Sequence, residues 1–237
     1  MDAILQAREK LLAVDCLKVL KENLTFKELS EEVDMPPGVL NRYINGYVLP
    51  KNSRAKSIIE AFIKERMSRI LTEESCCERS KVVITSTILS QPFLLELISF
   101  RVNELFCDEK PTKVLTIEVD GIPLAVKVAD FLGARSIYAK RKQEASLHGH
   151  YTSNNDHSHR SVATPLYLPK ELLKRNDSVL IVDDVVRGGT AMQLLVSICN
   201  QVRCRICGMF SIFMTKRAYE MFSRDFKISY LVQIGDA

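Results

Sequence analysis

The run SVLIVDDVVRGGTA at residues 178–191 constrains the fold more than any other part of this sequence. It begins with β-branched and other apolar residues, which are typical of a strand buried on both faces. The strand ends in two aspartates, whose charges have to meet water, a cation or a polar ligand. The Gly-Gly pair that follows leaves backbone N–H groups uncovered at the start of a helix. The run therefore predicts a buried strand that opens onto a binding loop.

The ligand predicted from these residues carries a phosphate group close to two neighbouring hydroxyls. Asp183 and Asp184 can accept hydrogen bonds from a vicinal diol, or coordinate Mg²⁺ directly or through water. The glycine-rich loop suits a phosphate, because N–H groups and the helix dipole both favour an anion at a helix N-terminus. A ribose 5-phosphate combines these two groups.

From Ser80 onwards, β-branched apolar stretches alternate with helical ones. Strands are predicted within residues 81–89, 113–119, 135–142, 178–184, 205–215 and 227–235, with helices between several of them. This alternation predicts right-handed βαβ units and an α/β domain whose parallel sheet is covered on both faces. Ligands bind such sheets at the carboxyl ends of the strands. We therefore expect three loops to share one edge, namely residues 118–122, 140–164 and 183–190.

The first 71 residues contain no convincing strand and are typical of helices. Thr25 and Glu28 match a capping box, which predicts that a short helix begins directly after the threonine. A Pro-containing turn and a second short helix follow, and a longer basic helix runs from Asn52 to about Leu71. Residues 42–69 hold seven basic and two acidic side chains. Such an excess of positive charge is typical of a surface that meets phosphates.

The stretch FKELSEEVDMPPGVLNRYINGYVLP, residues 26–50, resembles the Cro/repressor-type helix-turn-helix family. Asp34 stands where that family usually has a glycine, and aspartate tolerates the left-handed conformation better than most residues. The resemblance implies that the second helix enters the major groove of DNA. The residues that we expect to contact DNA are Val39, Asn41, Arg42, Asn45, Lys51 and Arg54. A small helical bundle used for dimerisation or packing is the alternative interpretation.

The C-terminal part, residues 80–237, is similar to the type I phosphoribosyltransferase fold, a Rossmann-like parallel sheet. Its order of motifs is closest to the purine-repressor branch, and the helical front end also resembles the archaeal helix-turn-helix regulators. The resemblance implies binding of phosphoribosyl pyrophosphate (PRPP) accompanied by Mg²⁺. For the ribose and its 5-phosphate it implies Asp183, Asp184, Val185, Val186, Arg187, Gly188, Gly189, Thr190 and Ala191. For pyrophosphate and a closing loop it implies Asp120, Gly121, Lys140, Arg141 and Lys142.

Three residues depart from the pattern of the resembled family. Ala191 replaces the threonine that usually closes the phosphate loop, and Arg187 stands where some members place a carboxylate base. Asp120 precedes Gly121 in the pyrophosphate loop, where a basic or small residue is usual. Two unit charges about 4 Å apart repel by roughly 4 kcal/mol at an effective dielectric constant near 20. Asp120 therefore points away, acts through a cation, or belongs to a site that does not handle pyrophosphate normally.

The remaining candidate ligands are histidines and cysteines. All four histidines lie within the polar tract 143–164, at His148, His150, His157 and His159. A metal site, closure over phosphates and a solvated loop all stay open for this tract, and we assign no metal ligand. The seven cysteines are scattered and odd in number, which favours structural thiols over a disulfide framework.

We predict two domains, a DNA-binding domain with its basic connecting helix at residues 1–75 and a PRPP-binding domain at residues 80–237. The predicted protein is a cytoplasmic, homodimeric transcriptional regulator of nucleotide or sugar-phosphate metabolism that senses PRPP or a related nucleotide and has no membrane contact. Two features speak against turnover of PRPP, namely Asp120 and a short C-terminal hood at residues 217–237 without an obvious base-reading set. We therefore assign no catalytic residue. An active purine or orotate phosphoribosyltransferase is the rival hypothesis, and nucleotide binding for another purpose is a third.

Overall fold

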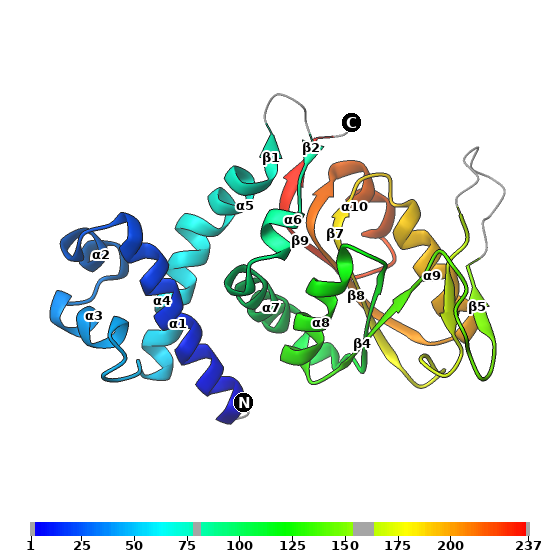
Figure 1. The fold of residues 1–237 in the computed structure, drawn as a ribbon, viewed down its shortest axis with the longest axis horizontal. Helices are drawn as coiled ribbons and strands as arrows, with labels where there is room; N and C mark the ends of the chain where they lie inside the picture. Colours follow the sequence, from blue (N-terminus) through cyan, green and yellow to red (C-terminus); the bar gives the residue numbers. More distant parts are fainter. Residues whose placement is uncertain (1–2, 78–81, 154–163, 236–237) are drawn as a thin grey trace. The chain divides into compact units, whose positions relative to one another are not determined.

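The computed structural model of the chain describes residues 3–77, 82–153 and 164–235 (Figure 1). The chain forms two compact units, Met1–Glu74 and Ser75–Ala237. No helix within the described ranges is long and apolar enough to cross a membrane. Each unit has its own set of fully buried apolar side chains, and the two are described separately.

The N-terminal unit is helical throughout its described part. Its elements are α1 (Ala3–Asn23), α2 (Phe26–Val33), α3 (Pro37–Ile44), α4 (Asn52–Phe62), the π-helical turn η1 (Ile63–Met67) and α5 (Ser68–Ser75). Thr25 and Glu28 form the predicted capping box, in which Glu28 Oε2 accepts a hydrogen bond of 2.7 Å from the Thr25 N–H. Leu17, Leu29 and Phe62 are fully buried, so α1, α2 and α4 meet through their apolar faces.

The turn between α2 and α3 is built by Asp34, which adopts the left-handed conformation with φ 50° and ψ 52°. The Asp34 N–H donates to the Ser30 carbonyl, and the Ser30 hydroxyl donates to the Met35 carbonyl at 2.6 Å. Aspartate therefore takes the backbone conformation that the resemblance assigns to a glycine. The geometry establishes two helices and a turn, and does not by itself establish a DNA-binding domain.

The C-terminal unit is built around a five-stranded parallel sheet in the order β4-β3-β7-β8-β9. Its strands are β3 (Lys113–Ile117), β4 (Arg135–Ala139), β7 (Ser178–Val186), β8 (Arg205–Thr215) and β9 (Ile228–Ile234). Two short antiparallel pairs accompany the sheet, β1 (Cys76–Cys77) with β2 (Val82–Val83) and β5 (His150–Thr152) with β6 (Tyr167–Pro169). The central strand β7 is fully buried from Val179 to Val182, which confirms the predicted buried strand.

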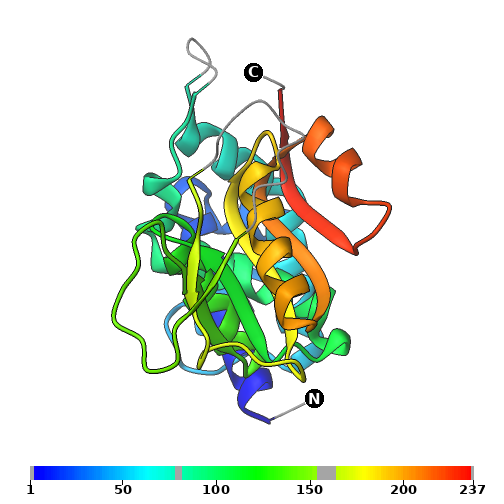
Figure 2. The ribbon, with the colours of Figure 1, turned by 90° about the vertical axis from the view of Figure 1, so that its right-hand side faces the viewer.

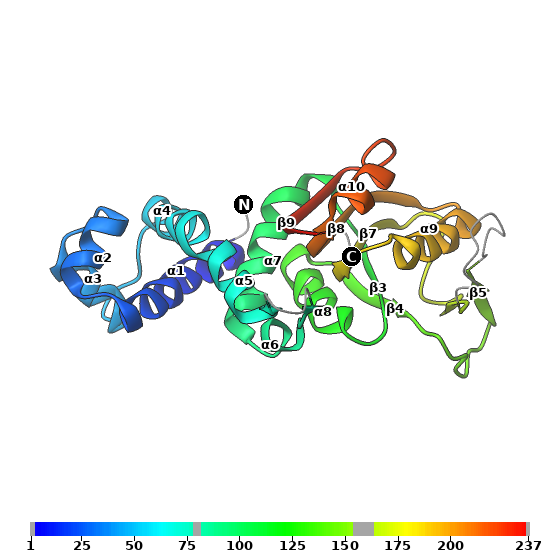
Figure 3. The same cartoon turned by 90° about the horizontal axis from the view of Figure 1, so that it is seen from above.

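Helices cover both faces of this sheet. The helices α7 (Pro92–Phe106) and α8 (Gly121–Leu132) lie on one side of the strands, and α9 (Thr190–Val202) lies on the other (Figures 1 and 3). Figure 2 shows α9 crossing in front of the strands. Met192, Leu195 and Ile198 of α9 share one buried cluster with Leu115 and Ile181 of the sheet. The short elements α6 (Ser86–Leu89), η2 (Cys107–Glu109) and α10 (Lys216–Phe222) complete the unit.

The segment that precedes α7 differs from the prediction. The sequence predicts a strand over residues 81–89, but within the described part of this range only β2 is extended, and α6 follows it. Thr85, Ile88 and Leu89 are buried, and their spacing of three and four residues suits a helix. Packing therefore overrides the β propensity of this segment.

The C-terminal segment also differs from the prediction. Residues 217–235 do not form a hood, because β9 is an edge strand of the main sheet, in register with β8 from Met209↔Ile228 to Thr215↔Ile234. Tyr219 of α10 packs edge-on against Tyr230 of β9, with ring centroids 5.6 Å apart. The segment belongs to the scaffold, and its lack of base-reading residues carries no weight against catalysis.

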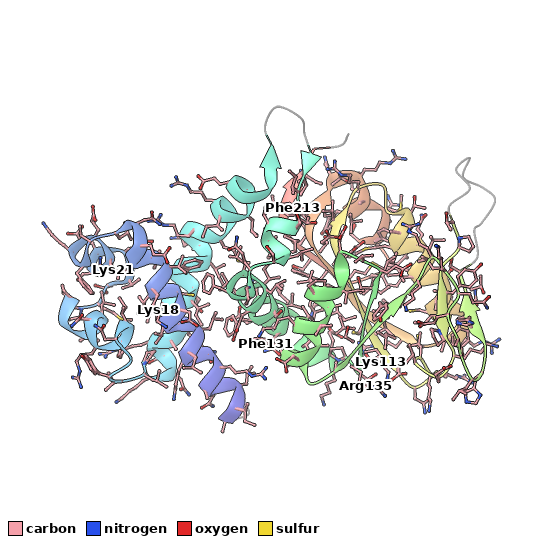
Figure 4. All side chains as sticks on the ribbon, viewed as in Figure 1. Lys18, Lys21, Lys113, Phe131, Arg135 and Phe213 are labelled. Atoms are coloured by element: carbon pink, nitrogen blue, oxygen red, sulfur yellow. The ribbon has the colours of Figure 1, made fainter. Side chains whose placement is uncertain are left out.

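The amino ends of β3 and β4 are closed by side chains of the domain itself. Figure 4 shows Lys113 and Arg135 close together at this end. Lys113 Nζ lies 4.0 Å from Asp177 Oδ1, and the Thr112 hydroxyl donates to the same oxygen at 2.8 Å. The loops that are open to a ligand therefore lie at the opposite, carboxyl end of the sheet.

Replacing Asp34 tests the strain in the turn between α2 and α3. Asp34→Gly should raise the free energy of unfolding by roughly 0.5–1 kcal/mol, because glycine adopts a positive φ without a Cβ clash. Asp34→Ala should lower it by about 1 kcal/mol, because alanine adds the clash and has no polar side chain to compensate. Urea denaturation followed by circular dichroism measures both changes. The reverse order of stability would contradict the assigned backbone conformation.

Candidate functional site

Loops from three strands meet at the carboxyl end of the sheet. The Glu118 N–H donates to the Ala139 carbonyl at 3.0 Å, and the Arg141 N–H donates to Glu118 Oε1 at 2.6 Å. The loops after β3 and β4 are thereby tied together. Because β7 is the other neighbour of β3, the loop after β3 also lies beside the two aspartates of β7.

The two aspartates have different surroundings. Asp184 is 8% exposed, and its Oδ2 accepts a hydrogen bond of 2.5 Å from the Thr85 hydroxyl. Asp183 is more exposed, and its Oδ1 accepts a hydrogen bond of 3.1 Å from the Asp184 N–H. Both carboxyl groups are held in place by these hydrogen bonds, and Asp183 as a whole residue is half-buried.

Several acidic side chains lie close together at the carboxyl end of the sheet. Burial of its carboxyl group raises the pKa of Asp183 well above the usual value, and the charges of Asp184 and Asp120 add to that shift. A carboxylate with a raised pKa among other acids is favourable only when a cation or several donors neutralise it. Such an arrangement is typical of a binding site rather than of a stabilising ion pair.

The glycine-rich loop leads directly into α9. Gly189 has φ 76° and is the N-cap of α9, whose N-terminus receives no side-chain cap. A Cβ at Gly189 would lie 2.9 Å from Met221 Sδ and 3.0 Å from the Phe222 ring, so glycine is required by both backbone and space. The Thr215 hydroxyl donates to the Arg187 carbonyl at 2.6 Å. The loop is therefore fixed from β8 while its first N–H groups stay available to an anion.

The other residues of this loop differ in burial. Val186 is buried, whereas Gly188 and Thr190 are exposed and Val185 is half-buried. Ala191 packs against the buried cluster beneath α9. The position where the resembled family has a threonine is thus used for packing, and Thr190 is the exposed hydroxyl at the start of the helix.

Gly121 brings the loop after β3 against Asp183. A Cβ at this position would lie 2.1 Å from Thr116 Oγ1 and 3.2 Å from Asp183 Oδ1. Thr116 Oγ1 is buried and has no hydrogen-bond partner within the described residues. Asp120, the residue before this glycine, is exposed. The close approach of loop and strand therefore depends on the absence of a side chain at Gly121.

The basic residues expected at the pyrophosphate loop are only partly brought to it. Lys140 forms an ion pair with Glu144, which raises the lysine pKa, and its Nζ lies 5.3 Å from the centre of the Tyr138 ring. Arg141 is attached to the site through its backbone N–H, and its side chain and that of Lys142 are exposed. In this structure none of the three side chains is recorded in contact with the two aspartates of β7.

Two of the four histidines lie in the described part of the chain. His150 begins β5, and its Nδ1 lies 3.1 Å from Gln143 Nε2, while His148 is exposed in the loop before it. His157 and His159 lie outside the described residues. Within residues 3–77, 82–153 and 164–235, no three His, Cys, Asp or Glu side chains group into a metal site. The role of the histidines stays a prediction.

Three of the six residues proposed to contact DNA form side-chain hydrogen bonds within their own unit. Asn45 Nδ2 donates to Asn41 Oδ1 at 2.8 Å, and Arg54 Nη1 donates to the Tyr43 hydroxyl at 3.0 Å. Val39 is half-buried, whereas Arg42 and Lys51 are exposed. Two arginines of the basic stretch pair with carboxylates of the same unit, Arg66 with Glu32 and Arg69 with Glu73. The excess of positive charge is therefore smaller in the folded unit than in the sequence.

The C-terminal unit is an α/β domain whose sheet edge brings two carboxyl groups close to an uncapped helix N-terminus. The family described as phosphoribosyl transferase domain matches residues 86–234. This match covers more than half of the chain, and the chain belongs to that family.

The curated relatives of this chain are enzymes by name. It is 34% identical to the xanthine phosphoribosyltransferase of Stutzerimonas stutzeri over 119 residues, which are 50% of this chain and 63% of that enzyme. It is 31% identical to the xanthine phosphoribosyltransferase of Brevibacillus brevis over 153 residues, 63% of this chain and 78% of that one. For the xanthine phosphoribosyltransferase of Pseudomonas entomophila the identity is 27% over 178 residues, with 72% and 93% covered.

Solved structures of adenine phosphoribosyltransferases share the fold. The enzyme of Leishmania tarentolae superposes with a TM-score of 0.61 at 17% identity, over 72% of this chain and 88% of that one. The enzyme of Rhodothermus marinus gives 0.59 at 16% identity, over 71% and 98%. These likenesses confirm the type I phosphoribosyltransferase fold with its parallel sheet.

The prediction of a DNA-binding transcriptional regulator is wrong, and so is the prediction that DNA is its partner. The matching relatives carry the names of phosphoribosyltransferases, which favour the rival hypothesis of an active enzyme. The homodimer was inferred from paired DNA half-sites and loses its basis with them. The expectation that PRPP is bound without turnover is likewise not supported by these relatives.

Sequence reasoning missed three threonines that support the site. Thr85 bonds Asp184, Thr215 bonds the Arg187 carbonyl, and Thr116 lies under Gly121. Thr85 is separated from its partner by 99 residues, so no local spacing could reveal the contact. For Thr116 the sequence held one indication. Gly121 follows it by five residues, and a glycine allows the chain to pass close to a side chain of the preceding strand.

The contact of Gly121 with Thr116 can be tested by a double-mutant cycle. Gly121→Ala should lower the free energy of unfolding by about 1–3 kcal/mol, because its Cβ overlaps a buried hydroxyl. Adding Thr116→Ala should recover part of that loss, because the overlapping atom is removed. Urea denaturation of the two single variants and the double variant measures the coupling. Strictly additive effects would contradict the contact.

The raised pKa of Asp183 predicts a dependence of stability on pH. Because burial raises this pKa in the folded protein, ionisation of Asp183 opposes folding as the pH rises through it. Asp183→Asn removes the titrating group, so the variant should be the more stable protein at about pH 7.5 and lose this advantage towards about pH 4. Urea denaturation at both pH values measures the difference.

A matched control for this comparison is Asp225→Asn, which changes an exposed carboxylate outside the site. If Asp183→Asn is less stable than the unaltered protein at the higher pH, the burial of that carboxyl group is wrongly assigned.

Proposed function

We propose that this chain is an active phosphoribosyltransferase that joins a purine base, with xanthine as the first candidate, to the phosphoribosyl group of PRPP. The observation that carries the proposal is the pair Asp183 and Asp184 within the last four residues of β7, which continues to Val186 rather than ending at residue 184 as the sequence predicts, followed by the glycine-rich N-terminus of α9. Its support from the comparisons is the name shared by the curated relatives.

In the proposed reaction a ring nitrogen of the base attacks C1 of the ribose. The bond between C1 and the pyrophosphate oxygen breaks, pyrophosphate leaves with that electron pair, and the base loses a proton to solvent. Asp183 and Asp184 accept hydrogen bonds from the two ribose hydroxyls and hold the ring in place. Their negative charge also stabilises the positive charge that develops on the ribose as the bond breaks.

The 5-phosphate is proposed to occupy the loop from Arg187 to Thr190. Its oxygens accept hydrogen bonds from the backbone N–H groups at the start of α9, which carry no side-chain cap. The bond from Thr215 to the Arg187 carbonyl keeps this loop in its bound shape before the ligand arrives. We propose no general base, because Arg187 stands where a carboxylate would be needed.

Mg²⁺ fits the chemistry of this edge. Mg²⁺ is usually held by one or two carboxylates together with substrate phosphates and water, and Asp183 and Asp184 would offer those carboxylates at this edge. When bound with PRPP, Mg²⁺ neutralises the pyrophosphate and makes it a better leaving group. The charge of Asp120 would then lie near pyrophosphate that is neutralised by a cation rather than near a bare anion. Asp120 therefore does not argue against catalysis.

Turnover with a panel of bases tests the proposal. The purified protein with PRPP and Mg²⁺ should convert xanthine to its nucleotide and release pyrophosphate at about 1 s⁻¹ or faster, an ordinary rate for an enzyme. Hypoxanthine, guanine and adenine should react more slowly, as measured by chromatography of the products. Binding of PRPP without turnover of any of these bases would contradict the proposed transfer.

The two aspartates provide a matched test of the site. Asp183→Asn combined with Asp184→Asn should lower kcat/KM by roughly 100-fold or more, because two hydrogen bonds to charged groups are weakened. Asp225→Asn should leave kcat/KM unchanged. Normal activity of the double variant would show that the diol binds elsewhere.

A further inference from the structure

Thr85 connects the segment that precedes the family region to the ribose carboxylates. It lies one residue before the matched region 86–234 and directly before α6. Its hydroxyl donates to Asp184 Oδ2 at 2.5 Å, across 99 residues of sequence. Both partners are almost fully buried, with 9% of Thr85 and 8% of Asp184 exposed. The bond is therefore shielded from competing water.

The hydroxyl of Thr85 does not cap the helix that follows it. Thr85 is the N-cap of α6, yet its side chain makes no capping hydrogen bond. Its backbone carbonyl instead accepts the N–H groups of Ile88 and Leu89, at 3.0 and 2.9 Å. A threonine at an N-cap usually uses its oxygen for the helix N–H groups. Here the carbonyl of Thr85 accepts the first hydrogen bonds of the helix, and its hydroxyl donates to Asp184, which is far away in sequence.

The short helix that follows Thr85 is packed into the domain. Ile88 is fully buried and Leu89 nearly so, which anchors the short helix α6 to the domain. A carboxylate rotates easily about its last side-chain torsion, because the wells of that torsion are broad. A donor that precedes a packed helix therefore restrains the rotation of the Asp184 carboxylate through its Oδ2 atom.

We propose that Thr85 is a positioning residue that holds Asp184 in the orientation that receives the ribose hydroxyls of PRPP. The affinity for PRPP then depends on a residue that does not itself contact the ligand. This inference rests on the proposed function for the identity of the ligand, but it concerns binding and does not require turnover.

The size of the effect follows from the kind of bond. Removing a donor to a buried carboxylate should weaken PRPP binding by about 10-fold to 100-fold, since hydrogen bonds to charged groups are among the stronger ones. The nucleobase makes no contact with Asp184 in the proposed site, so its KM should change little.

Thr85→Val, Thr85→Ser and Thr87→Val test this inference. Valine keeps the shape of threonine without its hydroxyl, and serine keeps the hydroxyl. Thr87 is an exposed threonine of the same segment whose hydroxyl donates to the Ile84 carbonyl at 3.1 Å, so Thr87→Val is the matched control. Isothermal titration calorimetry with PRPP and Mg²⁺ gives Kd, steady-state kinetics give KM and kcat, and thermal unfolding reports on stability.

Thr85→Val should raise the Kd and KM for PRPP by about 10-fold to 100-fold, whereas Thr85→Ser and Thr87→Val should stay within about threefold of the unaltered protein. An unchanged Kd in Thr85→Val would overturn the proposal. An equal loss in Thr85→Ser would also overturn it, because the effect would then come from packing. If Thr85→Val unfolds, the serine variant and Thr85→Ala replace it in the same comparison.

A second measurement asks whether Thr85 acts through Asp184. In an Asp184→Asn background, Thr85→Val should cause little further loss of PRPP affinity, and additive losses would overturn the inference. Binding of PRPP by the unaltered protein without turnover would contradict the proposed transfer alone and leave the role of Thr85 measurable. Absence of PRPP binding would overturn both.

Discussion

The structure of the C-terminal unit depends on one constraint, which is the placement of two neighbouring aspartate side chains near the carboxyl end of a buried strand. Strand β7, which carries Asp183 and Asp184, is paired on both sides, with β3 and β8, and helices cover both faces of the sheet. The carboxyl ends of these parallel strands converge on the same edge. The loop after β3, the loop after β7 and the helix α9 are thereby brought around the two carboxyl groups.

The residues around Asp183 and Asp184 are arranged for ligand binding at a cost to the stability of the fold. Gly121 and Gly189 allow close approaches that any side chain would obstruct, and glycine costs conformational entropy on folding. The carboxyl group of Asp183 is buried beside two other acids, which raises its pKa. Strongly perturbed acids at a sheet edge are typical of binding and catalytic sites. The Thr85 hydroxyl, which could cap its own helix, bonds Asp184 instead.

The N-terminal unit shows how a sound local pattern led to a wrong function. The capping box at Thr25 and the left-handed turn at Asp34 are present as expected, because both depend on residues a few positions apart. The function assigned to them rested on the resemblance of residues 26–50 to a helix-turn-helix family, and the excess of basic residues over 42–69 was taken as support. In the folded unit Arg66 and Arg69 pair with Glu32 and Glu73. Charge in a sequence is therefore a weak guide to a surface when the carboxylates that neutralise it lie elsewhere in the chain.

The sequence by itself determined the α/β class, the buried strand β7 with its two aspartates and the glycine-rich start of α9, because each of these is set by local propensity and spacing. Only the tertiary structure decided that residues 86–89 are helical and that β9 is an edge strand. It alone brought Thr85 to Asp184 and Gly121 to Asp183. These outcomes depend on which segments pack together, and a hydrogen bond across 99 residues leaves no periodic trace in the chain.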